Sequence, residues 1–287
     1  MNFHPTLPSP LGTVLQTIVD TTGDTPSVFA VECLTRGPRG SKLEQAPSLF
    51  DYIRRRGLET EMDCDVVGRA LRAAAGRAPR ITLNVHPSTL ADHGRFVRCL
   101  IRQTEMAGIE PSSVIVEVGE QTPASDPVAF ADALRELRGR GFAIAVDDVG
   151  FGYSNYKSIL DCQPDYLKID RHFVHGVSSD PGKVAVVRSI LALAEFFNAR
   201  VIAEGVEKEK DHELLKNLGI ELFQGFLFSR PEAVDGGQAI LPVRTGGIAC
   251  PPFRRWGGAF ARRQDSGERR GLLAAARRYR NRSRARA

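Results

Sequence analysis

Acidic and amide side chains recur along this chain at the ends of short apolar runs. The stretch AIAVDD at 143–148 ends in two adjacent aspartates, and Gly150 and Gly152 follow closely. Glycine adopts backbone conformations that other residues avoid, so the chain can turn sharply beside the paired charges. The other runs also carry a polar residue near their C-terminal end. Together these positions are Glu32, Asn84, Glu117, Asp147, Asp148, Lys168, Glu204 with the nearby Glu207, and Gln224.

Most of these side chains are carboxylates, and Lys168 is the one cation among them. If they gather in one place, the carboxylates cannot all stay ionised without more positive charge. Divalent cations would supply that charge, and carboxylate and amide oxygens suit magnesium or manganese better than zinc. Adjacent aspartates leave a strand end in different directions. One of Asp147 and Asp148 can therefore bridge two ions while the other serves one.

The competing interpretation for each residue is a strand that simply ends in water. Asn84 alone could begin a turn, and a lone lysine such as Lys168 is usually exposed. The recurrence of the pattern at most strand ends favours a shared site instead. We therefore expect a metal-dependent enzyme, provided that the fold brings these strand ends together.

The apolar runs have the length and the β-branched content of buried strands. They cover residues 15–20, 28–33, 81–85, 113–118, 142–148, 166–170, 200–205 and 221–225. Most segments between them have a helical pattern. In 125–141, Ser125 or Asp126 can cap a helix that a glycine ends. In 181–199, apolar residues recur at helical spacing.

Alternating strands and helices imply a mainly parallel sheet with right-handed crossovers. Eight candidate strands favour a closed TIM-type (β/α)8 barrel, with an open doubly wound sheet as the alternative. The open sheet has less support because no G-x-G-x-x-G follows a first strand. In a barrel the C-terminal ends of the strands meet at one rim, where catalytic groups lie. A barrel would thus bring the polar strand ends together.

The composition is that of an ordinary globular protein. The chain has 287 residues, of which 42% are hydrophobic and 25% charged, which fits one barrel domain. The five cysteines are scattered without a C-x-x-C pair, which favours reduced thiols over disulfides or a zinc site. The N-terminus has no secretory pattern, and no run of about 18 apolar residues occurs. We therefore expect a cytoplasmic protein without a membrane span.

The charge is divided unevenly along the chain. Residues 244–287 hold thirteen arginines and two acidic residues, a net charge of +11. Since the whole chain carries +5, residues 1–243 carry −6. We expect an N-terminal arm at 1–11, a folded domain at 12–238 and a basic, disordered tail at 239–287. The tail could also contact an anionic surface such as nucleic acid or lipid.

From residue 12 to about 235 the motifs resemble the EAL-domain phosphodiesterases that hydrolyse cyclic di-GMP. The name-giving motif E-A-L-x-R appears here as ECLTR at 32–36, and D-D-F-G-T-G-Y-S-S appears as DDVGFGYSN at 147–155. The other matching segments are QTIVD at 16–20, LNVHP at 83–87, EVGE at 117–120, DYLKID at 165–170, AEGVE at 203–207 and QGFLFSRP at 224–231. The family commonly reverses the first barrel strand relative to the other seven.

The resemblance implies two Mg²⁺ or Mn²⁺ ions, a bridging water and the linear product pGpG. One ion would be held by Glu32, Asn84, Glu117 and Asp147, and the other by Asp147, Asp148 and Glu204. Catalysis would rest on Glu32, Asp148, Glu204 and Lys168, with Lys168 contacting the attacking water or a phosphate oxygen. The dinucleotide would be bound by Gln16, Leu34, Arg36, Glu207 and Gln224. Glu120 would brace the 147–155 loop, which lies near a dimer interface in this family and implies a homodimer.

The chain departs from the family pattern at four positions. Cys33 replaces the motif alanine, which is nearly isosteric. Gly119 replaces a threonine, Val149 a phenylalanine and Phe151 a threonine, all beside the segment that positions Asp147 and Asp148. The predicted metal ligands are all present, which favours a working phosphodiesterase. The alternative is a weak or inactive module that binds cyclic di-GMP or a protein partner as a receptor.

Overall fold

The computed structural model describes residues 11–119, 126–150 and 155–234. The predicted strands all form and join in one sheet that closes on itself, so the barrel is confirmed and the open sheet is excluded. The strands are β1 Gly12–Asp20, β2 Ser27–Arg36, β3 Ile81–Val85, β4 Val114–Val118, β5 Ala143–Val149, β6 Tyr166–Ile169, β7 Arg200–Ala203, β8 Leu222–Gln224 and β9 Glu232–Ala233.

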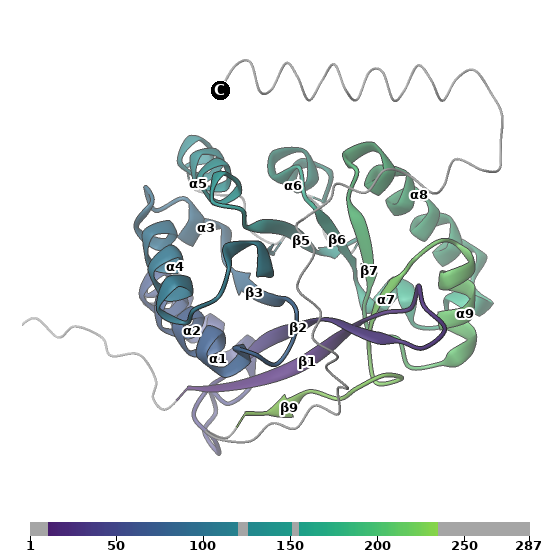
Figure 1. Ribbon diagram of the computed structural model, residues 1–287, viewed down its shortest axis with the longest axis horizontal. Helices are drawn as coiled ribbons and strands as arrows, with labels where there is room; N and C mark the ends of the chain where they lie inside the picture. Colours follow the sequence, from purple (N-terminus) through teal and green to yellow (C-terminus); the bar gives the residue numbers. More distant parts are fainter. Residues whose placement is uncertain (1–10, 120–125, 151–154, 235–287) are drawn as a thin grey trace, which may run out of the picture.

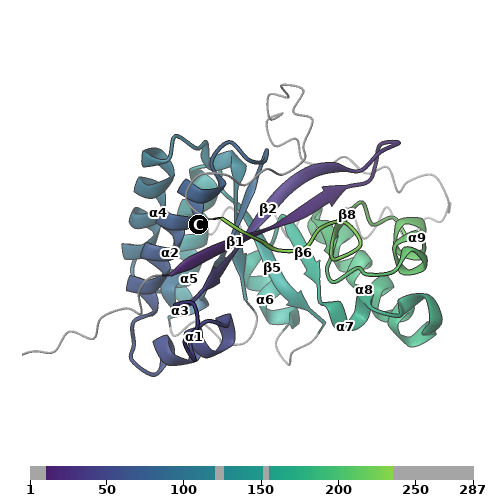
Figure 2. The same cartoon turned by 90° about the horizontal axis from the view of Figure 1, so that it is seen from below.

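The first strand runs against its neighbours. β1 is antiparallel to both β2 and β8, whereas β2 through β8 pair in parallel order around the barrel. The reversed first strand implied by the family resemblance is thus confirmed, and β1 and β2 form a long hairpin across the barrel (Figures 1 and 2). The short β9 adds to the outer part of β1, where Val14 pairs with Ala233. A strand of two residues is too short to show a pattern in the sequence.

Helices cover the outside of the barrel on both sides of the hairpin (Figure 2). They are α1 Ala46–Arg54, α2 Glu59–Ala74, α3 Pro87–Leu90, α4 Arg95–Met106, α5 Pro127–Gly139, α6 Asn155–Cys162, α7 Arg171–Val174, α8 Pro181–Phe197 and α9 Glu209–Asn217, with 3-10 turns η1 Pro111–Ser113 and η2 Val177–Ser179. Asp126 caps α5 by accepting bonds from the N–H groups of Val128 and Ala129. The caps and lengths of the two predicted helices agree with the sequence patterns.

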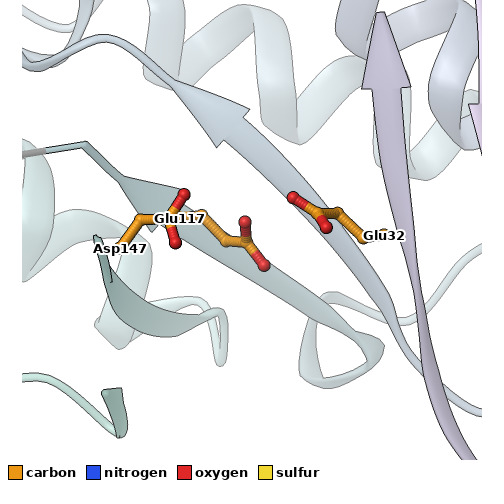
Figure 3. Close-up of side chains that lie close together, drawn as sticks. All are labelled: Glu32, Glu117 and Asp147. Carbon is orange, nitrogen blue, oxygen red and sulfur yellow. The ribbon is translucent and has the colours of Figure 1, made fainter. Parts of the chain in front are cut away.

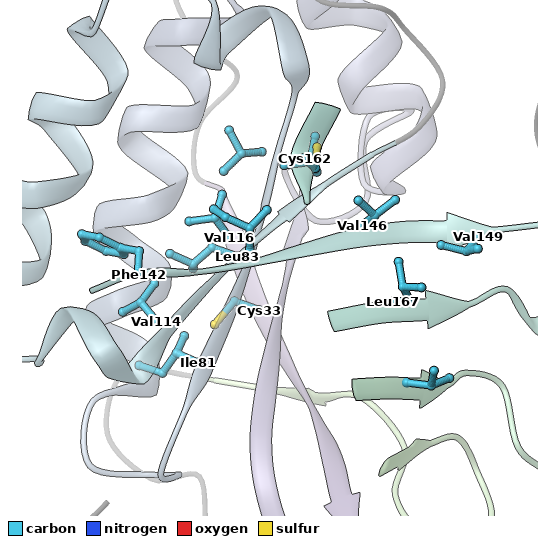
Figure 4. Packing of buried hydrophobic residues seen from close by; sticks show 14 of the residues in the cluster. Cys33, Ile81, Leu83, Val114, Val116, Phe142, Val146, Val149, Cys162 and Leu167 are labelled. Atoms are coloured by element: carbon cyan, nitrogen blue, oxygen red, sulfur yellow. The ribbon is translucent and has the colours of Figure 1, made fainter. Parts of the chain in front are cut away.

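The strand side chains alternate between two apolar layers. Outward-facing residues such as Leu83, Val116 and Val146 pack beneath the helices in the larger cluster (Figure 4). Inward-facing residues such as Ile115 and Ala145 form a smaller cluster inside the barrel. Because both faces are apolar, the strands read as nearly continuous hydrophobic runs. The inner cluster fills the lower barrel and leaves its C-terminal end for polar side chains.

Several sequence predictions lie outside the described residues. They are the supporting Glu120, the residues 151–154 of the proposed dimer loop, the arm at 1–10 and the tail at 239–287. In the part of the chain that the structure describes, no helix is both long and apolar enough to cross a membrane. The four cysteines described there, at 33, 64, 99 and 162, are free thiols, as expected.

Candidate active site

The predicted site residues form one polar layer directly above the inner apolar cluster. In β4, Ile115 belongs to that cluster, and Glu117 lies two residues further toward the C-terminal end. Side chains two apart in a strand share a face, so Glu117 must also point into the barrel. The same spacing relates apolar and polar residues in the other strands: Ala30 and Glu32, Ala145 and Asp147, Tyr166 and Lys168, Ile202 and Glu204, and Leu222 and Gln224. Strand periodicity therefore explains why these residues converge.

Lys168 lies at the centre of this layer. Its Nζ is 2.7 Å from Glu117 Oε2 and 2.7 Å from Glu204 Oε1. It is also 3.1 Å from Asp147 Oδ1 and 3.3 Å from Glu32 Oε1. Its side chain is only 1% exposed, so the ammonium is a buried cation shared by four carboxylates. The competing interpretation, in which Lys168 is an exposed residue at a strand end, is thereby excluded.

The carboxylates form two groups that share one member. Oxygens of Glu32, Glu117 and Asp147 lie within 4.8 Å of one another, and so do oxygens of Asp147, Asp148 and Glu204. Figure 3 shows the first group converging from separate strands. Asp147 belongs to both groups and Asp148 to one, which agrees with the expectation that one of the two aspartates could bridge two ions.

A local break in β5 places both aspartates at the site. The pairing with β6 shifts between Val146 and Val149, and Asp148 has a left-handed backbone with φ of 53°. Asp148 N–H donates to the Asp147 carboxylate at 3.0 Å. Gly150 follows with φ of 108°, and an added Cβ there would lie 2.6 Å from the Phe173 ring. The turn therefore requires glycine at this position.

The electrostatics follow from burial and crowding. Burial raises the pKa of Glu117, and the neighbouring Glu32 and Asp147 charges raise it further, so that it stays well above its usual value despite Lys168. Burial likewise raises the pKa of Glu204. Burial opposes the charge on Lys168, but the surrounding carboxylates outweigh it and raise the Lys168 pKa well above the ordinary value. Lys168 is therefore charged at neutral pH.

The amide side chains of Asn84 and Gln224, together with Asp148, complete the polar layer. Burial favours the neutral form of Glu32, but Lys168 and the hydrogen bonds from Gln224 and Asn84 outweigh it and lower its pKa. Gln224 Nε2 donates to Glu32 at 2.7 Å and Asn84 Nδ2 at 2.9 Å. Burial and then the Asp147 charge raise the pKa of Asp148 to about 6. Lys168 and the two amides thus favour the ionised form of Glu32.

These residues fit a pair of hard divalent cations. Five carboxylates against one ammonium leave four negative charges, which two divalent ions would balance. Glu117 Oε1 is buried without a hydrogen-bond partner, an arrangement that is costly unless a ligand satisfies it. Within the two groups every donor is an oxygen, which suits magnesium, manganese or calcium.

A pocket of about 300 Å³ opens above the carboxylates. Of the predicted substrate residues, Gln16, Leu34, Glu207 and Gln224 line it. Arg36 is not among the described lining residues, and its Nη1 donates to the Thr35 carbonyl at 2.9 Å. Glu207 belongs to neither carboxylate group, and its carboxylate pairs with Arg171 at 2.7 Å.

Four lining residues were missed from the sequence: Arg171, Gly205, Gly225 and Phe226. Arg171 begins α7 just beyond the β6 strand end, where the pattern of polar strand ends no longer applies. Gly225 has an added-Cβ position 2.1 Å from the Val206 carbonyl oxygen, so only glycine lets these two loops meet. Phe226 is 46% exposed. An apolar residue in a motif is expected to be buried, so nothing in the sequence indicated this exposure.

Cys33 faces away from the pocket. Its Sγ lies 3.9 Å from the Ala70 carbonyl of α2, in the outer apolar layer. Burial raises the pKa of this thiol, and the Glu32 and Glu117 charges add to the effect. The cysteine therefore packs as a small apolar side chain, as expected for a replacement of alanine.

The fold and the acidic layer agree with comparisons to known proteins. The pattern of the family described as EAL domain matches residues 10–231. The chain belongs to the EAL domain family. The cyclic di-GMP phosphodiesterase RocR of Pseudomonas aeruginosa is 34% identical over 159 residues, which are 55% of this chain and 40% of RocR. The probable cyclic di-GMP phosphodiesterase PdeA of Escherichia coli is 35% identical over 159 residues, 54% of this chain and 21% of PdeA. This EAL domain chain thus matches less than half of either relative.

Solved EAL structures superpose on most of the chain. The PaMucR phosphodiesterase in complex with c-di-GMP gives a TM-score of 0.68 at 29% identity, covering 77% of this chain and 92% of that one. Klebsiella pneumoniae BlrP1 in its manganese and cyclic di-GMP complex at pH 6 gives 0.69 at 31% identity, covering 78% and 56%. The fold of this EAL domain is therefore shared with proteins that were solved with the dinucleotide bound.

Proposed function

We propose that this EAL domain is a metal-dependent phosphodiesterase that hydrolyses cyclic di-GMP to linear pGpG. The observation that carries the proposal is the pair of carboxylate groups sharing Asp147 at the floor of a pocket. The dinucleotide in the PaMucR and BlrP1 structures supports the choice of substrate. Every residue that we predict as a metal ligand is present in the chain, which supports a working enzyme.

The ions would be Mg²⁺ or Mn²⁺. Glu32, Asn84, Glu117 and Asp147 would hold one, and Asp147, Asp148 and Glu204 the other. Bound divalent cations supply an activated water and neutralise the oxygens of the reacting phosphate. Manganese in the BlrP1 complex supports a divalent ion of this kind.

The protein's own side chains would hold and orient the reactants. If ions held the carboxylates, Lys168 Nζ would be available to donate to a phosphate oxygen or to the attacking water. Gln224 and Asn84 keep Glu32 ionised and fixed through their amide hydrogen bonds. The inner apolar cluster lies below the carboxylates, and the described pocket opens above them. Gln16 and Leu34 line that approach beside β1 and β2 and would contact the dinucleotide.

The test is incubation of the purified protein with cyclic di-GMP and Mg²⁺ or Mn²⁺, followed by chromatography for pGpG. Glu32→Ala and Asp147→Ala should each abolish turnover, since both remove a ligand from the shared groups. Glu213→Ala, an exposed position on α9, serves as the matched control and should leave turnover unchanged. Full hydrolysis by either ligand variant would defeat the assignment. Binding of cyclic di-GMP without turnover by the wild type would identify a receptor instead.

Four further proposals concern the whole protein. We propose a homodimer through the 147–155 region, which analytical ultracentrifugation would test. We also propose a cytoplasmic location and a division into an arm, a domain at 12–238 and a basic tail. The tail's charge of +11 supports contact with an anionic surface. Removal of residues beyond about 240 should abolish a salt-sensitive interaction with nucleic acid or anionic vesicles.

A further inference from the structure

Two cysteines meet at the seam between α2 and α4, on the outside of the barrel. Cys64 lies on α2 and Cys99 on α4, and the two thiols are in hydrogen-bonding contact. Both are free and partly exposed, whereas the other described cysteines, Cys33 and Cys162, are buried. Among the described cysteines, this pair therefore combines mutual contact with access from solvent.

The packing of the two helices explains why these thiols meet. Figures 1 and 2 show α2 and α4 side by side. Gly68 lies one turn after Cys64, and an added Cβ at Gly68 would lie 2.7 Å from Gln103 Oε1. Gln103 in turn lies one turn after Cys99. Residues four apart share a helix face, so both pairs belong to one seam. The close approach at Gly68 thus brings the two cysteine side chains together one turn earlier.

The surroundings of the two thiols give them different reactivity. Burial raises the pKa of Cys64 to about 12, and the hydrogen bond and the charge of Cys99 add to this effect. The charges of Asp63 and Asp92 act in the same direction. Cys64 is therefore a neutral thiol at neutral pH. Since the thiolate is the nucleophile in thiol oxidation, Cys99 is the member of the pair that reacts first.

We propose that Cys64 and Cys99 are a redox-active pair, which a peroxide converts reversibly into a disulfide between α2 and α4. In the first step the Cys99 thiolate attacks one oxygen of hydrogen peroxide, the O–O bond breaks, and hydroxide leaves. Cys99 is then a sulfenic acid. In the second step the Cys64 sulfur attacks the Cys99 sulfur, the S–O bond breaks, and the Cys64 proton leaves with the hydroxyl group as water.

The two steps balance and can be reversed. The proton that Cys99 lost on ionisation converts the hydroxide of the first step into water. Two thiols are thereby oxidised to one disulfide, and one peroxide is reduced to two water molecules. A thiolate such as that of dithiothreitol restores both cysteines by thiol–disulfide exchange. In a reducing compartment the pair would rest as thiols and form the disulfide only transiently.

The competing account is that the two cysteines only fill space between the helices. A free cysteine packs as a small apolar side chain, and Cys64 does contact the outer apolar cluster. Cysteines that only fill space would stay reduced in peroxide, or each would oxidise alone. A redox pair forms one specific cross-link instead. The two accounts therefore predict different products of the same treatment.

The experiment treats the full-length protein with hydrogen peroxide and maps its unreduced peptides by mass spectrometry. We expect a Cys64–Cys99 link in the wild type with a loss of about 2 Da, which dithiothreitol reverses. Cys250→Ser is the matched control, because it removes the cysteine outside the described residues and keeps the pair; it should form the same link. In Cys64→Ser the sulfenic acid at Cys99 lacks its second thiol and should react with dimedone.

The disulfide should also raise the melting temperature. It closes the segment 64–99, which contains β3, and so restricts the unfolded chain. For a domain of this size, peroxide-treated wild type should melt roughly 4–12 °C above the reduced protein. Cys64→Ser and Cys99→Ser should show no such rise after the same treatment.

Each contrary result has a defined meaning. The inference would be overturned by a wild type without the Cys64–Cys99 link, by a link through Cys250 in its place, or by an oxidation that dithiothreitol does not reverse. An unlabelled Cys99 in Cys64→Ser, or a melting temperature that peroxide does not raise in the wild type, would also overturn it. The mapping and the melting of the wild type need no variant, so they decide the matter even if the serine variants do not fold. None of these measurements involves cyclic di-GMP or metal, so a failure of the proposed activity would leave this inference standing.

Discussion

Replacement of Lys168 by methionine tests whether the ammonium holds the acidic layer together without metal. Methionine has a similar length and removes only the charge and the donors. Four carboxylates would then lack the cation that now lies 2.7–3.3 Å from each of them. Removal of one partner from a buried ion pair costs roughly 3–5 kcal/mol, because the remaining charge stays buried. For a domain of this size that predicts a melting temperature lower by roughly 6–20 °C.

The loss should depend on pH and on metal. Burial raises the pKa of Glu117 and Glu204, so the folded protein binds protons there more tightly than the unfolded chain. Stability from these groups therefore falls as pH rises from their ordinary value of 4.5 toward the raised one. Lys168 opposes this shift, so Lys168→Met should lose more stability at about pH 8 than at about pH 5.5. Millimolar Mg²⁺ or Mn²⁺ should restore much of the loss by replacing the missing charge.

The assay is urea unfolding of the metal-free protein at both pH values, with and without added metal. Lys210→Met is the control, since Lys210 is exposed on α9, makes a 3.4 Å contact with Ser179, and otherwise acts on the neighbouring Asp211 through its charge. It should change the free energy of unfolding by less than about 0.5 kcal/mol. Equal urea midpoints for Lys168→Met and wild type at about pH 8 without metal would refute the account of the site as a lysine-centred cluster.

Three further substitutions test the scaffold. Burial raises the pKa of Asp63 to about 7 from its ordinary 3.8, so stability should fall as pH rises through that interval. Asp63→Asn should stabilise the fold at about pH 8 by on the order of 2–4 kcal/mol and little at about pH 4; equal urea midpoints at pH 8 would contradict this. Arg200→Ala should lower the free energy of unfolding by roughly 1–3 kcal/mol, because Asp20 and Glu221 each lose an ion-pair partner at 3.0 Å. KM should stay constant, and a changed KM would show that this end of the barrel is coupled to the pocket. Gly150→Ala should raise the Mn²⁺ concentration for half-activity, because its Cβ displaces Phe173 and the β5 turn; an unchanged metal titration would show that the turn can adapt.

The barrel and the composition of the acidic layer could be predicted because each depends on strand periodicity. Ile115 and Glu117 stand two apart in one run, and the same interval separates Ala145 from Asp147. In a closed parallel barrel, the polar residues that follow the inner apolar residues of each strand lie in one layer. Identifying the strands therefore also identified the site. Residues that follow this rule appear in the sequence as polar strand ends.

The remaining site residues break that rule. Asp148 was predicted from its place beside Asp147, but it reaches the site through a left-handed backbone that interrupts the strand, a conformation that periodicity does not specify. The sequence did not show the residues beyond the strand ends. Arg171 and Phe226 lie beyond the strand ends, in loops that Gly205 and Gly225 allow to pack closely. Such contacts join residues far apart in the chain, for example Gly225 against Val206. Neither periodicity nor composition specifies them.

The position of Lys168 has a consequence for the proposed metal site. A barrel with five converging carboxylates would be costly to fold without ions, and the buried ammonium offsets much of that cost. The same ammonium competes for Glu117 and Glu204, because its contacts at 2.7 Å occupy oxygens that an ion would need. An ion held by these carboxylates would compete with Lys168 for their oxygens, and Lys168, which lines the pocket, would then be available to a phosphate there. Lys168 would thus have two roles. Without metal its ammonium stabilises the fold by neutralising the carboxylates. With metal bound, the same ammonium would donate a hydrogen bond to the substrate.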